Sequence, residues 1–163
     1  MQHRYLPAVA AGLVMAIIGA LGWAAGAPWL FPSLGPTIAI QAEASDSPVA
    51  RPWNVVAGHF IGAAVGFAAV HLSGVIREPA MNLSHALTGP RVAAASLAVL
   101  ASMALQALAR ANHPPAQATT LLVVVGALDA DLHGAIVLTA GVLLVAALGE
   151  PVRRMALSKR RSD

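Results

Sequence analysis

Long apolar segments alternate along this chain with shorter ones that prolines interrupt. Four long apolar segments can be read, and most approach the roughly 20 residues that a membrane-spanning helix needs: residues 6–25, 53–75, 92–109 and 134–149. Two shorter apolar stretches, 29–41 and 116–128, lie between them, and each is preceded by a proline-containing break. A proline removes a backbone donor and ends a helix, so each short stretch is predicted to be a broken or half helix.

The order long, short, long occurs twice, which indicates a repeat of three elements in each half. The interrupted stretches 33–37 and 112–116 occupy corresponding places, although the residue-level similarity of the halves is weak. Paired interrupted segments are typical of transporter binding sites. We predict an all-α, polytopic transmembrane helix bundle with four long spans plus two short half helices. A 3+3 inverted repeat is favoured, and four crossings with re-entrant short elements is the alternative.

The composition places the chain in a bilayer. Of its 163 residues, 58% are hydrophobic and 10% are charged, whereas a soluble domain carries about 25% charge. We predict one transmembrane domain, residues 1–151, and a basic tail, residues 152–163. Half of the ten Lys and Arg residues lie in that tail, so the pI near 10.6 indicates a cytoplasmic end rather than a nucleic-acid partner. The chain has no cysteine, which excludes disulfides and thiolate metal sites.

Positive charge predicts that both termini are cytoplasmic. With six crossings, Arg51 and Arg110 lie on the side of the tail while Arg77 and Arg91 lie outside. With four crossings these pairs exchange sides, so the positive-inside rule does not choose between the two models. The first 27 residues resemble a signal peptide, but their apolar run of about 20 residues exceeds the 7–15 of a secretory signal. We therefore expect a first span, and an integral protein of a bacterial inner membrane.

The two breaks are the candidate binding sites. A helix that begins inside a bilayer points unpaired N–H groups and a partial positive charge inward, which suits a small anion. No Lys or Arg lies in the middle of an apolar segment, so backbone N–H groups of residues 37–39 and 117–119 and nearby hydroxyls are the expected donors. The alternative is that the hydroxyls only satisfy nearby carbonyls. The candidate substrate-binding residues are Ser33, Gly35, Thr37, Asn54, His59, His113, Pro114, Pro115, Gln117, Thr119 and Thr120.

His59 is the candidate proton carrier. At 100° per residue it lies about 20° from Gly66 and about 60° from Gly62 on the same helix, so we expect it to face a neighbouring helix. An ionisable residue inside a membrane is a functional candidate, and His shuttles protons near neutral pH. A neutral imidazole that bridges helices is the alternative. The glycines at 58, 62 and 66 predict close helix packing.

Other polar residues have simpler interpretations. Asn54 is expected to pin the loop after Pro52, and His113 either donates to an anion or fixes the broken backbone. Arg110 is expected to snorkel at a helix end. Three potential ligands share one short loop, and a solvated turn explains them better than a metal site: Asp129, Asp131 and His133. We predict no metal, no cofactor and no catalytic residue.

Two separated motifs resemble those of a known family. One is His113-Pro114-Pro115 with Ala116, Ala118 and Thr119; the other is Asp46-Ser47-Pro48 followed by Pro52, Asn54, Gly58 and His59. Together with Ser33-Leu34-Gly35, they make the chain similar to the HPP family of integral membrane proteins over nearly its whole length. The resemblance implies about four transmembrane segments. It also implies nitrite as a candidate substrate, because some plant chloroplast and cyanobacterial members are implicated in nitrite transport. Gln117 departs from the small residue that relatives often have.

Three classes of function follow from these patterns. The leading hypothesis is a transporter or channel for a small inorganic anion, with nitrite as a candidate and with coupling to protons as an option. An intramembrane enzyme would need acid and base groups or a metal set at reacting distance, and no Asp or Glu lies deep in a segment, so we do not expect an enzyme. An intramembrane His-metal enzyme is the weaker alternative, which would be revived if two of four dispersed histidines converged on a metal: His59, His71, His113 and His133. A structural or regulatory subunit would leave both breaks filled by side chains. The expected partners are a small anion and the lipid bilayer, without nucleic acid; the small-residue faces also permit a homo-oligomer.

Overall fold

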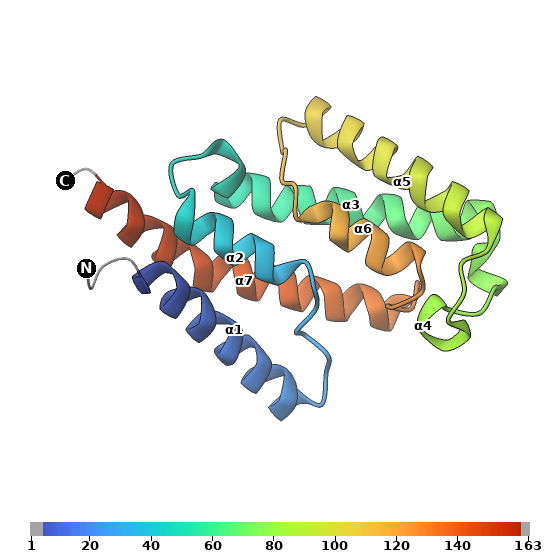
Figure 1. Cartoon of the computed structure of the whole chain (residues 1–163), viewed down its shortest axis with the longest axis horizontal. Coiled ribbons are helices and arrows are strands. Elements are labelled where there is room, and N and C mark those ends of the chain that lie inside the picture. Colours follow the sequence, from blue (N-terminus) through green and yellow to red (C-terminus); the bar gives the residue numbers. More distant parts are fainter. Residues whose placement is uncertain (1–4, 161–163) are drawn as a thin grey trace.

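The computed structural model describes residues 5–160, and in this part of the chain all regular structure is helical (Figure 1). The α-helices are α1 (Leu6–Ala25), α2 (Leu34–Glu43), α3 (Pro52–Ser73), α4 (Met81–Ser84), α5 (Gly89–Leu108), α6 (Ala116–Val124) and α7 (Leu132–Arg160). Two short 3-10 helices, η2 (Pro48–Ala50) and η3 (Val75–Arg77), flank α3.

The four long predicted segments are confirmed as helices. Among the described residues, α1, α3, α5 and α7 are long and apolar enough to cross a membrane. The fourth is longer than expected, because α7 continues through Pro151 to Arg160. Residues 152–160 of the predicted tail continue the last helix, and the remainder of that tail lies outside the described residues.

The first and last helices meet at one end of the bundle, which we call the terminal end. Leu6 of α1 and Met155 of α7 line one groove there. The end of α2 joins them, because the Arg160 guanidinium donates to the backbone carbonyl of Glu43. The opposite end, which we call the loop end, carries α4 and the start of α7 (Figure 1).

Each short helix, together with the irregular segment before it, runs between the two ends. Pro28, which precedes α2, lines a pocket at the loop end. In the second half, the Asn112 carbonyl accepts a hydrogen bond from Asn54 in the first turn of α3, and Val125 after α6 accepts one from Met81. Residues 5–160 therefore pass six times between the ends, and the direction reverses at each pass (Figure 1).

This path selects one of the two charge arrangements. Arg51 precedes α3 and Arg110 follows α5, so both lie toward the terminal end, whereas Arg77 and Arg91 lie at the loop end. The arrangement corresponds to the six-crossing model. Charge alone did not distinguish it from the four-crossing model, because both models divide the charges equally, and the paired breaks in the sequence favoured six crossings.

The helix contacts repeat from one half to the other. α2 packs against α1 and α7, and α6 packs against the elements that correspond to them, α5 and α3. α1 also packs against α7, as α5 does against α3, while α3 and α7 contact each other. Each of these pairings among the six helices is thus preserved when the two halves are exchanged. This is the packing expected of a 3+3 inverted repeat.

Glycines set the close approach of α6 to α3. A Cβ added to Gly58 would lie 2.7 Å from the Cβ of His113, and one added to Gly66 would lie 3.1 Å from that of Val123. Between them, a Cβ on Gly62 would lie 2.7 Å from the backbone oxygen of Ala116. The predicted glycine face is therefore confirmed as a packing face.

The other interface repeats this arrangement with the same spacing. On α7, a Cβ on Gly141 would meet the ring of Phe31, and one on Gly149 would overlap the amide of Gln41. The two glycines are eight residues apart, as Gly58 and Gly66 are, and their partners are ten residues apart in both halves.

The spacing makes Thr37 and Thr119 equivalent, because each lies six residues after the first of these partners, Phe31 and His113. The match of 33–37 with 112–116 was therefore wrong by three residues. The two breaks share too few residue types to show which positions of the two halves correspond, whereas the glycine contacts fix this correspondence sterically.

Candidate functional site

Five polar side chains meet where both short elements contact α3, and we call them the central cluster. Ser33 and Thr37 come from the start of α2, His59 from α3, and His113 and Thr119 from the break before α6 and from α6 itself. None is more than 1% exposed. Each was a predicted candidate, so the structure brings together residues from both breaks and from the long helix between them.

Local packing places the two imidazoles side by side. Gly58 precedes His59, and its missing side chain leaves room for the Cβ of His113. The ring centroids lie 4.9 Å apart, with planes inclined by 62°. The backbone N–H of His113 donates to Oε1 of Gln106 at 3.1 Å, which holds the break in place.

Thr37 bridges both rings. Its Oγ1 lies 2.9 Å from Nε2 of His59 and 3.0 Å from Nε2 of His113. The same hydroxyl lies 2.8 Å from the backbone oxygen of Ser33, one turn earlier. One threonine therefore joins two histidines that are distant in the sequence.

The remaining ring nitrogens have separate partners. Nδ1 of His59 lies 2.7 Å from Oγ1 of Thr119, which in turn lies 2.8 Å from Oγ of Ser33. Nδ1 of His113 lies 2.8 Å from the backbone oxygen of Val49. Because a carbonyl oxygen only accepts, this nitrogen of His113 carries a hydrogen.

The central cluster has one hydrogen fewer than it has contacts. The six described contacts within it and to the carbonyls of Ser33 and Val49 each need one hydrogen. Three hydroxyls and two neutral imidazoles supply five. A proton added to Nε2 of His113 supplies the sixth: both rings then donate to Thr37, and Thr37 donates to the Ser33 carbonyl. The Thr119 hydroxyl, which donates to Ser33 in the structure, then turns to donate to Nδ1 of His59, and the Ser33 hydroxyl donates to Thr119.

A second polar group lies beside the central cluster and supports it. Thr120 lies 3.0 Å from the Gly62 carbonyl and 3.3 Å from Oγ of Ser102, to which Gln106 also donates. Thr120 therefore faces α3 and α5 rather than the imidazoles. Ser102, Gln106 and Arg110 follow one another at intervals of four residues. Arg110, the last of them, is exposed and takes a left-handed backbone conformation, with φ of 51°.

The other predicted candidates lie around the central cluster and not in it. Asn54 donates to the backbone oxygen of Asn112 at 2.9 Å, which pins the break as expected. Pro115 is the buried residue that precedes α6, and Pro114 is exposed. Gln117 is half-buried, and its Oε1 has no hydrogen-bond partner among the described residues. Gly35 is half-buried, with open space where a Cβ would lie.

The backbone donors differ from expectation. The N–H groups of Gln117 and Ala118 donate to the carbonyls of Pro114 and Pro115, each at 3.1 Å, and that of Thr37 donates to Ser33. The prolines lack N–H groups but keep their carbonyls, which turn back and accept from the first turn of α6. The polar atoms at the centre are therefore side-chain atoms rather than free helix-terminal N–H groups.

The loop before α7 is a helix cap. Oδ1 of Asp131 accepts from the backbone N–H of Gly134 at 2.7 Å, in the first turn of that helix. Among the described residues, no group of three or more His, Asp or Glu side chains lies close enough to hold a metal ion. The interpretation of this loop as a turn therefore agrees with its geometry.

Sequence reasoning missed two buried polar residues on α2 and in the turn after it. Gln41 follows Thr37 by four residues, and Ser45 follows Gln41 by four. Both are fully buried. The spacing of four from Ser33 onward was the available signal, because it places these side chains on one helix face.

The fold and the central cluster define a polytopic α-helical membrane protein with a hydrogen-bonded histidine pair buried between two broken segments. The family model described as the HPP transmembrane region matches residues 1–162. The chain therefore belongs to the HPP transmembrane family, and the resemblance noted in its motifs is confirmed. No curated protein and no solved structure matches it.

Proposed function

We propose that this protein carries a small inorganic anion together with a proton across the membrane, and that the central cluster is where both bind. Nitrite is the first anion to test, because the motif resemblance points to it. The observation that carries the proposal is the missing hydrogen: six contacts share five hydrogens until one proton is added.

The burial of the central cluster supports the coupling of proton and anion. An imidazolium alone in a nonpolar interior is costly, because burial removes the water that stabilises its charge. In the described part of the chain, no carboxylate, lysine or arginine side chain is hydrogen-bonded to His59 or His113. A small anion beside the protonated pair would neutralise this charge, so each ligand favours binding of the other.

Uptake into proteoliposomes tests the proposal. Purified protein is reconstituted, and uptake of nitrite, nitrate and other small anions is measured with an imposed pH gradient in each direction. Nitrite also diffuses as its neutral acid, so empty liposomes at the same pH set the background. We expect saturable uptake that is faster when the anion side is the acidic side.

His59→Val and His71→Val form a matched pair for this assay. His59 is fully buried in the central cluster, whereas His71 is exposed on the same helix, where its Nδ1 lies 2.8 Å from the Phe67 carbonyl oxygen. We expect His59→Val to reduce uptake to the level of empty liposomes and His71→Val to retain it. Equal activity of both variants, with both eluting as folded protein, would remove the central cluster from the mechanism.

A structural or regulatory subunit is the second candidate. The observation that favours it is that the side chains of the two breaks bond one another, as in Thr37 to His113 and Thr119 to Ser33. Under this alternative, no anion in the panel is taken up above empty liposomes in either direction of the pH gradient, and His59→Val lowers only stability.

A further inference from the structure

One face of α2 and the turn after it is polar from the central cluster to the terminal end. Ser33, Thr37, Gln41 and Ser45 follow one another at intervals of four residues, and none is more than 1% exposed. Along α2 this spacing places Ser33, Thr37 and Gln41 on one helix face, and the buried Ser45 follows in the turn after the helix. We call these four residues the polar row. The first two belong to the central cluster, so the row leads from the cluster toward the end of α2.

The outer part of this row has polar atoms that the protein does not satisfy. Nε2 and Oε1 of Gln41 and Oγ of Ser45 are buried without a hydrogen-bond partner among the described residues. Buried polar groups in native proteins are nearly always bonded to protein or to ordered water. Within a bilayer, unsatisfied polar atoms of this kind indicate a hydrated or ligand-filled space.

The facing helix makes room for the Gln41 side chain at this level. Gly149 of α7 lies against Gln41, and a Cβ there would overlap the amide. The equivalent pair in the other half is Gly66 with Val123, where the side chain is apolar and fully buried. The polar row is therefore a property of α2 and not of the repeat.

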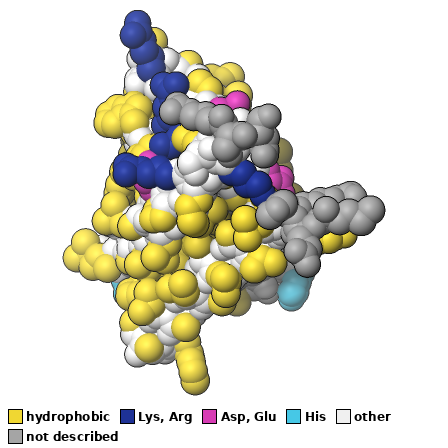
Figure 2. Space-filling view, turned by 90° about the vertical axis from the view of Figure 1, so that its left-hand side faces the viewer, with side chains coloured by type: hydrophobic (Ala, Val, Ile, Leu, Met, Phe, Trp, Pro, Cys, Tyr) yellow, Lys and Arg dark blue, Asp and Glu magenta, His cyan; other side chains and the backbone are white. Residues whose placement is uncertain are grey.

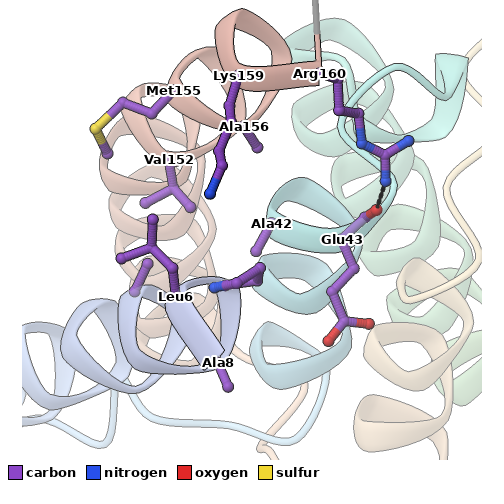
Figure 3. Close-up of a pocket in the computed structure, with 11 residues that line it drawn as sticks. Leu6, Ala8, Ala42, Glu43, Val152, Met155, Ala156, Lys159 and Arg160 are labelled. Carbon is purple, nitrogen blue, oxygen red and sulfur yellow. Dashed lines mark hydrogen bonds between the residues drawn. The ribbon is translucent and has the colours of Figure 1, made fainter. Parts of the chain in front are cut away.

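The row ends beside a groove at the terminal end. The groove has a volume of about 660 Å³ and is lined by residues that include Ala42, Val152 and Lys159 (Figure 3). The amino group of Lys159 points into it (Figure 3). The backbone oxygen of Ser45 accepts from Arg153 at 3.2 Å, and the same guanidinium is ion-paired with Glu150. Figure 2 shows basic side chains gathered among apolar ones at this end of the molecule. Such a mouth attracts anions.

The other side of the central cluster is apolar. Beyond Thr119, α6 continues toward the loop end with Val123 and Val124, and beyond His59 the buried side chains of α3 include Ala63 and Val70. All four belong to the hydrophobic core. Polar side chains therefore lie between the central cluster and the terminal end, whereas packed apolar side chains lie between the cluster and the loop end.

We propose that Gln41 and Ser45 line the route by which a small hydrogen-bonding solute, proton or anion, passes between the terminal end and the central cluster. This inference rests on the proposed function, since it supplies the access path for that site. The Gln41 amide offers both a donor and an acceptor, and the Ser45 hydroxyl does so again one turn further on, so each can accompany water, a proton or an anion.

Cysteine accessibility tests this route, and the chain is suited to it because it has no native cysteine. Gln41→Cys and Ser45→Cys are compared with Val123→Cys, the equivalent of Gln41 in the other half. Silver ion in a nitrate buffer is added to one side of oriented membrane vesicles. The protein is then denatured, and the thiols that silver left free are labelled with a fluorescent maleimide. Ser158→Cys and Ser84→Cys, both exposed, report the terminal and the loop side.

Silver added at the terminal side should block Gln41→Cys and Ser45→Cys at least about tenfold faster than Val123→Cys, because a reactive thiolate needs access to water. Silver added at the loop side should block none of the three. The inference is overturned if both route cysteines react as slowly as Val123→Cys, or if they react from the loop side. Ser45→Cys replaces one small side chain by another and covers the case in which Gln41→Cys does not fold.

The assay requires no transport, so the two proposals fail separately. Anion uptake with unreactive route cysteines would retain the function and reject the route. Reactive route cysteines without uptake of any anion would support the route and reject the proposed solute.

Discussion

The two interfaces between a short helix and a long helix have the same architecture and opposite chemistry. Where α6 packs on α3, the first glycine contact involves His113, and His59 follows the glycine. Where α2 packs on α7, the equivalent positions hold Phe31 and Val142, both buried. One interface therefore contains both imidazoles, and the other contains an aromatic ring and a valine at the same places.

The comparison distinguishes the residues that build the fold from the residues that form the site. Glycines at equivalent positions allow backbone approach in both halves, which is a steric requirement of close helix packing. The polar groups do not follow the repeat, apart from Thr37 and Thr119, which contact opposite nitrogens of one ring. A symmetric frame thus supports an asymmetric site, and each prediction below compares a residue that contacts or belongs to one short helix with a residue that contacts or belongs to the other.

The largest difference is expected at the arginines that hold the ends of the short helices. Arg91 is buried, and its guanidinium donates to four backbone oxygens, including that of Val124 at the end of α6. Arg91→Gln removes a charge-assisted donor set from buried carbonyls and should lower the free energy of unfolding by about 3 kcal/mol or more. Thermal unfolding in detergent micelles measures the effect. A loss below that of Arg160→Gln, its counterpart at the end of α2, would contradict this account.

Thr37→Val and Thr119→Val test the equivalent threonines. Loss of the Thr37 hydroxyl leaves Nε2 of both His59 and His113 without a partner, so we expect a cost of about 2–4 kcal/mol. Loss of the Thr119 hydroxyl removes the partner of one ring nitrogen, Nδ1 of His59, and should cost about 1–2 kcal/mol. Both valines keep the side-chain shape. Equal losses in chemical denaturation would mean that Thr37 does not bridge the rings.

Gly62→Ala and Gly149→Ala compare the two close approaches. A methyl group at Gly62 meets the backbone oxygen of Ala116, which cannot move without shifting α6, so a cost of about 1–3 kcal/mol is expected. At Gly149 the obstacle is the end of the Gln41 side chain, which can rotate, and the cost should stay below about 1 kcal/mol. Gly12→Ala, with open space around its Cβ, is the control. A larger loss at Gly149 would show that the Gln41 amide is held rigidly.

The helices were predictable because their signals are local. Composition and segment length predicted all four long helices, and the prolines at positions 114 and 115 correctly indicated where α6 begins. The end of α7 was missed because the apolar run stops at Gly149 and polar, basic residues follow, although the helix continues through them to Arg160. In the structure Glu150 bonds Arg153 and Arg154 along the same helix face, which stabilises that continuation.

The sequence predicted which residues belong to the site but not how they are arranged. His59, His113 and both threonines could be named from sequence because polar residues are rare in apolar segments. Their mutual bonding depends on how α2 and α6 approach α3, which sequence spacing does not specify. The role of Arg91 was missed for the same reason, since its carbonyl partners are brought together only by the packed loops at the loop end.

The smallest effect is expected at the other helix-end arginine. Arg160 donates to the Glu43 carbonyl at the end of α2 and lies 3.2 Å from Oδ1 of Asp46, but the side chains of this ion pair are 54% and 65% exposed. Water competes for both groups, so Arg160→Gln should change the free energy of unfolding by only about 0–1 kcal/mol, and less in high salt. Thermal unfolding at low and high salt, beside Arg91→Gln, measures this. A loss as large as that of Arg91→Gln would show that the ends of α2 and α6 depend equally on an arginine. The burial of Arg91 at the loop end would then not make the two halves differ in stability.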